Sequence, residues 1–235
     1  MDRWRTDAAR NNAEWCDIVC RSHGGTTRFD DDAWTSGRRT PPYYPDAVTL
    51  TPEPSVPDLL SRIDTSAGCS VKDSFASLDL SEHGFRLLFE AQWMVRTEAT
   101  PITPMTHTAN PTWEKVEDAE SLHQWEEAWR HDDGPAGLFR AELLDEESVT
   151  VLACRRPEGY VAGAVLNQSA TVVGLTNFFS RRGPVAASWA GCLALADTLF
   201  RASTLVGYDT DEHLGAARHH GFASAGALRV WIRDN

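Results

Sequence analysis

The spacing of apolar residues in the second half of the chain predicts helices and strands in a regular order. Leu122, Trp125 and Trp129 recur at helical spacing, which places them on one face of a helix. Between the helices lie short apolar runs typical of strands. In chain order, the predicted elements are a strand at 113–116, a helix at 118–130, strands at 148–154, 160–167 and 171–179, a helix after Pro184, a strand at 204–207, a helix at 211–219 and a strand at 227–232.

The first half of the chain shows a weaker pattern. The residues around Trp34, Arg38 and Pro41 have neither a helical nor a strand period, so this stretch is predicted to be irregular. The other predicted elements are a helix at 7–21, a strand at 47–50, a helix at 56–63, and the segments 69–80 and 85–93.

A stretch rich in Thr and Pro, at 97–112, separates the two halves. It lacks both periods, which is typical of a linker. We therefore predict an N-terminal part at 1–96, a linker at 97–112 and a C-terminal domain at 113–235.

One short motif occurs twice. His83-Gly84-Phe85 is followed by Trp93, and His220-Gly221-Phe222 is followed by Trp231. A strand that ends in polar residues precedes each copy, at 71–74 and at 206–209. The repetition indicates that the N-terminal part is a degenerate copy of the C-terminal half, with coincidence as the alternative.

Composition narrows the classes of protein. A hydrophobic content of 42% with nine tryptophans predicts a globular chain. The net charge of −12 argues against non-specific binding to nucleic acid, although it leaves room for a local anion site. The chain has no apolar run long enough for a membrane span and no signal-peptide pattern at its start. We therefore predict a cytoplasmic protein with no membrane partner.

The five cysteines do not predict a disulfide framework, because their number is odd and their spacing irregular. Cys16, Cys20 and His23 suggest a metal site by spacing alone. Zinc prefers four ligands, and no second Cys/His pair lies at ligand spacing. We predict buried free thiols and no metal.

The element order over 113–232 resembles the GNAT superfamily of N-acetyltransferases. Three features carry the resemblance: the strand 171–179 with its turn and helix, the segment 205–208 before the next helix, and residues 216–222 before the last strand. It implies an α+β fold with a mixed central sheet flanked by helices, and it covers about half the chain. The N-terminal part would then be a degenerate half-repeat of that fold.

The resemblance also implies where an acyl donor binds. GNAT enzymes hold the pantetheine arm between two splayed strands, and they cradle the pyrophosphate on backbone amides at a helix N-terminus. The matching turn here is 181–187, where Pro184 removes an amide and Val185 adds bulk. Acyl-CoA is therefore a possible co-substrate, with no tightly bound cofactor. The implied donor-binding residues are Thr176, Phe178, Arg181, Arg182 and Gly183.

For the chemistry, many GNAT enzymes use a tyrosine as the acid at the position that Ala217 occupies here. Tyr208 either takes over this role or is an edge aromatic. Asp209 either contributes to the site or caps the next helix. Asn177 is informative because a buried amide in an apolar strand must find partners. The predicted catalytic residues are Asn177, Tyr208 and Asp209.

The repeat adds candidates for contact with the substrate or donor. Lys72, Asp73 and Ser74 would lie opposite Tyr208 if the two halves pair, and otherwise form a solvated turn. Arg38 and Arg39 lie among aromatic residues, a combination that suits a nucleotide or anion, or a loop pinned on the core.

Three functions fit these residues. The first is an amide-forming N-acyltransferase that acts on a small-molecule amine, with acyl-CoA as the favoured donor. The second keeps the chemistry but takes the acyl group from aminoacyl-tRNA, as some GNAT relatives do. The third is a non-catalytic binding protein with the same fold.

Overall fold

The structure, a computed structural model, describes residues 2–97, 112–130 and 134–234. The chain divides into two compact units. Unit 1 comprises Met1–Met94, Tyr208–Asp211 and Ser224–Asn235, and unit 2 comprises Val95–Gly207 and Glu212–Ala223. The last strand therefore belongs with the N-terminal residues. The predicted linker lies outside the described residues except at its two ends, and the prediction of a half-repeat stays a prediction.

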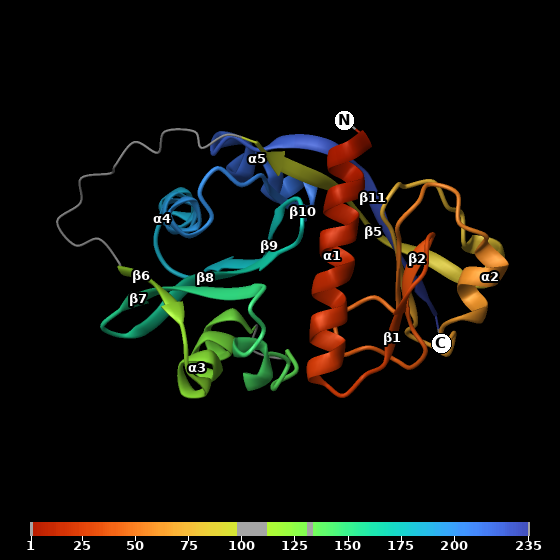
Figure 1. Cartoon of the computed structure of the whole chain (residues 1–235), viewed down its shortest axis with the longest axis horizontal. Coiled ribbons are helices and arrows are strands. Elements are labelled where there is room, and N and C mark those ends of the chain that lie inside the picture. Colours follow the sequence, from red (N-terminus) through yellow and green to blue (C-terminus); the bar gives the residue numbers. More distant parts are fainter. Residues whose placement is uncertain (1, 98–111, 131–133, 235) are drawn as a thin grey trace. The chain divides into compact units, whose positions relative to one another are not determined.

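Unit 1 is built on strands whose side chains alternate between two helix-covered faces. Ala33 and Val71 pack with Leu59 of α2 (Val56–Ser61). On the other face, Lys72 Nζ donates to Asn12 Oδ1 of α1 (Asp2–Ser22) at 2.8 Å. Figure 1 shows α1 and α2 on opposite sides of these strands. Their order is β1 (Thr27–Phe29), β2 (Ala33–Ser36), β3 (Ala47–Thr49), β4 (Ser70–Asp73), β11 (Ala223–Arg233) and β5 (Phe85–Arg96), with β3 and β4 parallel.

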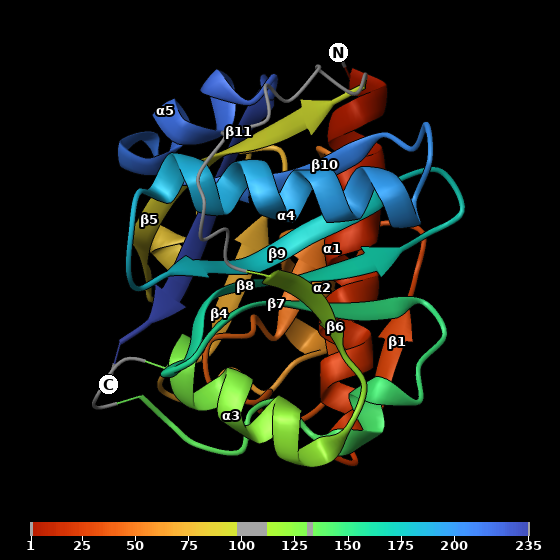
Figure 2. The same ribbon diagram turned by 90° about the vertical axis from the view of Figure 1, so that its left-hand side faces the viewer.

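Unit 2 has its own run of strands. Their order is β10 (Leu205–Asp209), β9 (Val173–Ser180), β8 (Gly159–Gln168), β7 (Val149–Arg156) and β6 (Thr112–Val116). Only the β10–β9 pair is parallel among the registers of these described strands. Figures 1 and 2 show α3 (Ala119–Trp129) and α4 (Val185–Leu199) on opposite faces of this sheet. The remaining elements are η1 (Ser81–His83), η2 (Ala141–Leu144) and α5 (Asp211–His219).

Two glycines let helices approach this sheet closely. A Cβ on Gly163 of β8 would lie 2.2 Å from Trp125 Nε1, so only glycine leaves room for the indole. Trp125 uses that room to donate Nε1 to the Leu152 carbonyl at 2.9 Å. In the same way, a Cβ on Gly191 of α4 would lie 2.0 Å from Trp113 Nε1. The α3 and α4 layers are therefore positioned by backbone contact as well as by hydrophobic burial.

Most predicted elements are present with boundaries shifted by a few residues. The exceptions lie in the stretch that was predicted to be irregular, which contains the three-residue strand β1 and, around Trp34, the strand β2. This strand has only four residues, all buried, so it shows no alternation that a sequence pattern could reveal. No helix among the described residues is both long and apolar enough to span a bilayer.

The two His-Gly-Phe motifs adopt the same local geometry. Gly84 and Gly221 both have left-handed backbones, with φ of 80° and 89°. Phe85 N–H donates to the Leu80 carbonyl at 3.3 Å, and Phe222 N–H donates to the Ala217 carbonyl at 3.2 Å, five residues back in each case. Each motif ends a helical segment, η1 or α5, and starts a long strand.

Candidate functional site

Strand β9 carries a β-bulge at the predicted site residue Asn177. Val165 of β8 pairs with Thr176, while Gly163 pairs with Phe179, so one strand has an extra residue. Asn177 takes the left-handed conformation, φ 52°, which asparagine tolerates better than most residues. A bulge leaves a backbone group without its ladder partner. The bulge therefore interrupts the regular backbone ladder in the middle of β9.

The edge of β9 that faces β10 is paired over a short length. The parallel register joins Leu205 to Val173 and Val206 to Gly174, whereas β9 itself runs on to Ser180. Within this second half of β9, Thr176 Oγ1 donates to Asn177 Oδ1 at 3.2 Å. Backbone groups beyond Gly174 are therefore the part of β9 that suits an extended ligand arm.

The turn after β9 leads directly into the N-terminus of α4. Gly183 has φ 92°, and Pro184 is the N-cap with no side-chain cap. The N–H groups of Val185 and Ala186, in the first turn, have no intrahelical acceptor. A hydrogen bond of 2.8 Å between Ser180 Oγ and Ser188 Oγ fixes the strand end to the helix. The turn thus presents two amides and the positive end of a helix dipole.

The two arginines of this turn differ in what they contact. Arg181 Nε donates to the Ala128 carbonyl at 2.7 Å, and its Nη2 donates to the carbonyls of Trp129 and Arg130. Arg181 therefore caps the C-terminus of α3, and its predicted contact with the donor stays a prediction. Arg182 is exposed and has no ion-pair partner among the described residues.

A third arginine near this turn was missed from the sequence. A Cβ on Gly183 would lie 3.5 Å from Arg156 Nη2, so that guanidinium lies beside the turn. Arg156 is the last residue of β7, and the β7–β8–β9 pairing brings it there. No sequence spacing signals this approach, because it depends on two strand pairings.

Aromatic rings connect the bulge to the end of α5. Phe178 stacks on Trp189 of α4 with ring centroids 4.3 Å apart, and Trp189 lies 6.4 Å from the His220 ring at an angle of 23°. Burial lowers the pKa of His220, and His219 and Arg96 lower it further, against a hydrogen bond with the Ala186 backbone that raises it. His220 is therefore neutral at pH 7.

Two buried side-chain nitrogens of unit 2 lack a hydrogen-bond partner among the described residues, His220 Nε2 and Arg96 Nε. Arg96 is 2% exposed, and its Nη1 and Nη2 bind both carboxylate oxygens of Asp197 at 2.8 and 2.9 Å. His220 was not among the site residues predicted from the sequence. The groups around His220 come from β5, α4 and α5, so only the tertiary structure reveals its surroundings.

In unit 1 the structure brings Lys72 and Tyr208 together. Lys72 Nζ lies 4.0 Å from the centroid of the Tyr208 ring, and it donates to Asn12. Trp93 packs edge-on against Tyr208 at 5.6 Å and donates Nε1 to the Ser74 carbonyl at 2.8 Å. Lys72 is 3% exposed and forms no ion pair with any described residue. Asn12 was not singled out in the sequence.

The neighbours of these residues have other contacts. Asp73 accepts from the N–H groups of Phe75 and Leu78, at 3.2 and 2.8 Å, and burial raises its pKa. Its carboxylate therefore organises the following turn. Asp209 accepts from Thr210 N–H at 2.8 Å, at the start of α5. Ser74 is fully buried, and its Oγ has no partner among the described residues.

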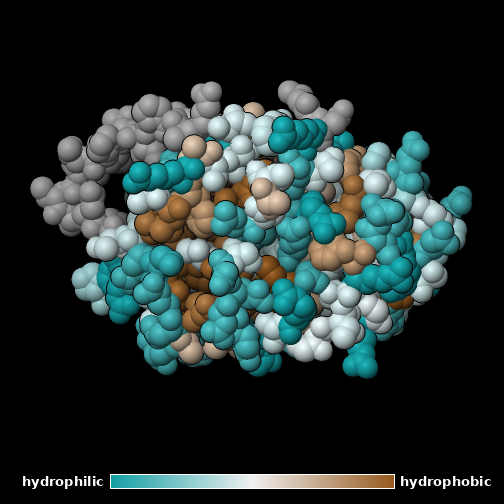
Figure 3. All heavy atoms as spheres, viewed as in Figure 1, coloured by the Kyte–Doolittle hydropathy of each residue, from teal (hydrophilic) through white to brown (hydrophobic). Residues whose placement is uncertain are grey.

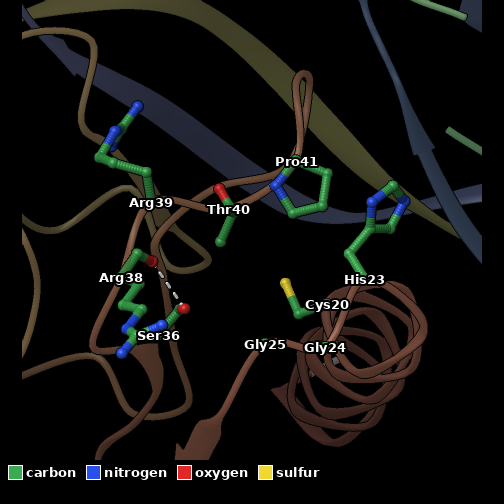
Figure 4. A pocket seen from close by; sticks show the side chains of 9 residues that line it. All are labelled: Cys20, His23, Gly24, Gly25, Ser36, Arg38, Arg39, Thr40 and Pro41. Carbon is green, nitrogen blue, oxygen red and sulfur yellow. Dashed lines mark hydrogen bonds between the residues drawn. The ribbon is translucent and has the colours of Figure 1, made fainter. Parts of the chain in front are cut away.

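Arg38 and Arg39 lie apart from Lys72 in sequence and line a pocket of unit 1 that has a volume of about 300 Å³ (Figure 4). Across the described parts of the chain, no three His, Cys, Asp or Glu side chains gather as metal ligands. All five cysteines are free and buried. Burial raises the pKa of the Cys16 thiol to about 11 and that of Cys69 to about 12.

Comparisons with known proteins agree with this architecture. No protein-family model matches the sequence, and no curated protein does. Among solved structures, the chain is similar to a GCN5-related N-acetyltransferase from Kribbella flavida, with a TM-score of 0.66 and 15% identity over 97% of this chain and 96% of that one. It is also similar to a functionally unknown conserved protein from Staphylococcus epidermidis (0.61, 11%, 90% and 94%). A third is a GCN5-related N-acetyltransferase-like protein from Streptococcus suis (0.56, 16%, 99% and 99%).

These similarities confirm the predicted α+β fold of the GNAT type. They extend over nearly the whole chain, whereas the sequence pattern supported about half of it. At identities this low, the similarity establishes the fold and leaves the reaction to the site itself.

Proposed function

We propose that this chain is an amide-forming N-acyltransferase that transfers the acyl group of an acyl-CoA to a small-molecule amine. The observation that carries the proposal is the bulge at Asn177, which lies in the strand that leads into the α4 N-terminus. An acyl-CoA donor needs a hydrogen-bond donor at its thioester carbonyl and an anion site at its phosphates. We expect the bulge to serve the first need and the α4 N-terminus the second.

The bulge suits the carbonyl end of the donor. When the amine attacks the thioester, a C–N bond forms, negative charge develops on the carbonyl oxygen, and the C–S bond then breaks. A preorganised backbone N–H stabilises that oxyanion without reorganising. We expect the bulge at Asn177 to supply such a backbone donor, next to Phe178, whose ring is held against Trp189.

The α4 N-terminus suits the phosphate end. The amides of Val185 and Ala186, the helix dipole and the exposed Arg182 all favour an anion there. Pro184 removes one donor and Arg181 is engaged elsewhere, so we expect weaker CoA binding than a complete cradle gives.

Two groups are candidates for the proton transfers of this reaction. Tyr208, predicted from the sequence, is the candidate acid for the leaving thiolate, whereas His220, whose lowered pKa keeps it neutral, is the candidate base for the attacking amine. Ala217, at the position of the usual acid, is buried and has no titratable group. His220 directly follows α5, and its buried Nε2 has no hydrogen-bond partner among the described residues. Tyr208→Phe and His220→Gln test these two roles separately, since loss of a proton-transfer group lowers kcat more than it changes CoA affinity.

Calorimetric titration with CoA and acetyl-CoA tests the donor site. We expect saturable binding, weakened about fivefold or more by Arg182→Gln. Arg201→Gln is the matched control, because Arg201 is also an exposed arginine of unit 2 without a described ion-pair partner. Absence of binding at millimolar CoA would overturn an acyl-CoA donor.

The bulge is tested by two substitutions at Asn177. Glycine keeps the positive φ and the backbone N–H, whereas valine strongly disfavours that conformation. With acetyl-CoA and a panel of amines, we expect thiol release to survive Asn177→Gly within about fivefold and to fall about 100-fold in Asn177→Val. A glycine variant as inactive as the valine variant would assign the role to the side chain instead.

A second donor, aminoacyl-tRNA, is favoured by one specific observation. Arg181, the basic residue at the head of the predicted cradle, caps α3. A gel shift with charged tRNA tests this alternative, and binding should weaken steeply with salt. Binding of charged tRNA without binding of CoA would replace the first proposal by the second.

A further inference from the structure

Unit 1 contains a pocket of about 300 Å³ at the C-terminal end of α1 that the acyltransferase proposal does not use. Figure 4 shows Cys20 and His23, from α1 and the residue after it, on one side and Arg38 and Arg39 on the other, with Thr40 and Pro41 between them. The loop that follows β2 thus forms one wall and the end of a helix the other. This volume is at the lower limit of ligand pockets, which suits a small metabolite and excludes a whole CoA.

The charge of the lining differs from that of the chain. The chain carries 34 acidic residues and a net charge of −12, yet no Asp or Glu lines this pocket. Its lining holds two arginines and a histidine. On so acidic a protein, a pocket lined by cationic side chains without acids favours an anionic ligand.

The two arginines are not equivalent. Arg39 donates to Asp46 and to the Gly68 carbonyl, and Asp46 is fully buried. Its charge is therefore already neutralised. Arg38 is exposed, and its guanidinium has no hydrogen bond or ion pair with any described residue. Arg38 is the cation that remains for a ligand.

The walls are held in place before any ligand arrives. Besides Arg39, buried Asp46 accepts from Thr40 N–H at 3.0 Å and from Ser70 N–H at 2.9 Å, which fixes the loop on β4. On the helix side, Gly25 N–H donates to the Cys20 carbonyl at 2.8 Å, and a Cβ on Gly25 would collide with that same oxygen. A rigid pocket loses little entropy on binding.

We propose that this pocket binds a small organic anion, a carboxylate or a phosphate monoester, with Arg38 as its charged contact. The anionic group binds Arg38 at the rim, and the Cys20 and Pro41 side contacts the rest of the ligand. Burial keeps the Cys20 thiol protonated, so it contributes a neutral wall. The proposal does not depend on the acyltransferase reaction.

Backbone amide NMR of the whole protein, titrated with inorganic phosphate and separately with acetate, tests this site. Sodium chloride at equal ionic strength is the reference. We expect saturable shifts at the amides of Gly24, Gly25 and Gly37, which no chloride titration reproduces. The stronger of the two probes identifies the anion class. Shifts that are linear, or equal to those with chloride, would overturn the proposal.

Variants then assign the contact. Arg38→Gln should weaken the affinity for the stronger probe about tenfold. Arg201→Gln removes the same charge elsewhere and should change it less than twofold. Because the Arg38 guanidinium has no partner among the residues that the structure describes, its variant should keep the wild-type spectrum away from the pocket. Equal weakening by both variants would show a general charge effect, which also overturns the proposal.

Discussion

The two His-Gly-Phe motifs have the same sequence and the same backbone hydrogen bonds, but their side chains meet different surroundings. Phe85 is buried among Leu80, Trp231 and the α2 side of unit 1. Phe222 packs against Trp189 of α4 in unit 2, 5.8 Å between ring centroids. His83 is exposed, whereas burial lowers the pKa of His220. The local motif therefore determines the backbone conformation. The elements packed against it determine the burial of its side chains and the pKa of its histidine.

The largest expected effect comes from the two phenylalanines. Phe85→Ala and Phe222→Ala each remove a buried ring, so each should lower the free energy of unfolding by about 3–5 kcal/mol in urea titrations. The variants should differ in function. Only Phe222→Ala loosens Trp189, so it alone should weaken CoA binding beyond what its folded fraction explains. Equal loss of CoA binding in both variants would contradict the division of roles.

The aspartates before the two motifs give the next effect. Asp73→Ala leaves the buried N–H of Leu78 unsatisfied and should cost about 2–3 kcal/mol. Asp209→Ala removes a half-buried acceptor at the start of α5 and should cost about 1 kcal/mol. Chemical denaturation of both variants measures the difference. A larger cost at Asp209 would mean that its side chain has the more important structural role.

The two glycines should behave alike. Gly84→Ala and Gly221→Ala both force a left-handed backbone on a residue with a Cβ, at a cost of about 1–2 kcal/mol each. Gly215→Ala in α5 is the control, since nothing lies within 4 Å of a Cβ there. That variant should be neutral or slightly stabilising. If the two glycine variants lose unfolding free energies that differ by more than about 1 kcal/mol, the backbone hydrogen bonds common to both motifs do not determine the cost.

The smallest effect is a pH dependence specific to His220. Its pKa in the folded protein lies below its unfolded value of 6.5, so the unfolded state binds the proton more tightly. Stability should therefore fall as the pH drops below about 6.5 and level off below the folded pKa. His220→Gln should remove this slope, measured as Tm between pH 7.5 and 5, and His83→Gln should leave it unchanged. A slope that survives His220→Gln would assign it to other groups.

Part of the surface of unit 2 around α4 is apolar. Figure 3 shows hydrophobic atoms between polar side chains around α4. Val185 and Leu199, at the two ends of that helix, are 47% and 39% exposed. The exposed apolar residue at the first position of α4 is the same one that adds bulk to the predicted phosphate turn. This exposure leaves the helix N-terminus open to a ligand.

The sequence predicted much of the fold because local rules apply there. Tryptophans at helical spacing predicted α3, and apolar runs predicted β7, β8 and β9 within a few residues. Pro184 predicted the start of α4. The strand β2 was missed, because four buried residues carry no period.

The site was predicted less completely. Asn177 was singled out as a polar residue in an apolar strand, and it lies at the bulge. Arg181 was predicted to contact phosphate, which stays a prediction; the structure adds that it caps α3, with its acceptors more than 50 residues away in sequence. Arg156 approaches the same turn only through two strand pairings. The roles of Tyr208, Asp209 and Lys72 stay predictions.

The sequence by itself determined where the backbone bends and which segments are helices or strands. Those features depend on neighbours within a few residues, as the glycines at φ 80° and 89° illustrate. Only the tertiary structure decided which polar groups are engaged and which are open. The contacts that decide it join Lys72 to Asn12, Arg96 to Asp197 and Arg181 to Ala128, residues 60, 101 and 53 positions apart. Burial and charge act through space, so no local pattern encodes them.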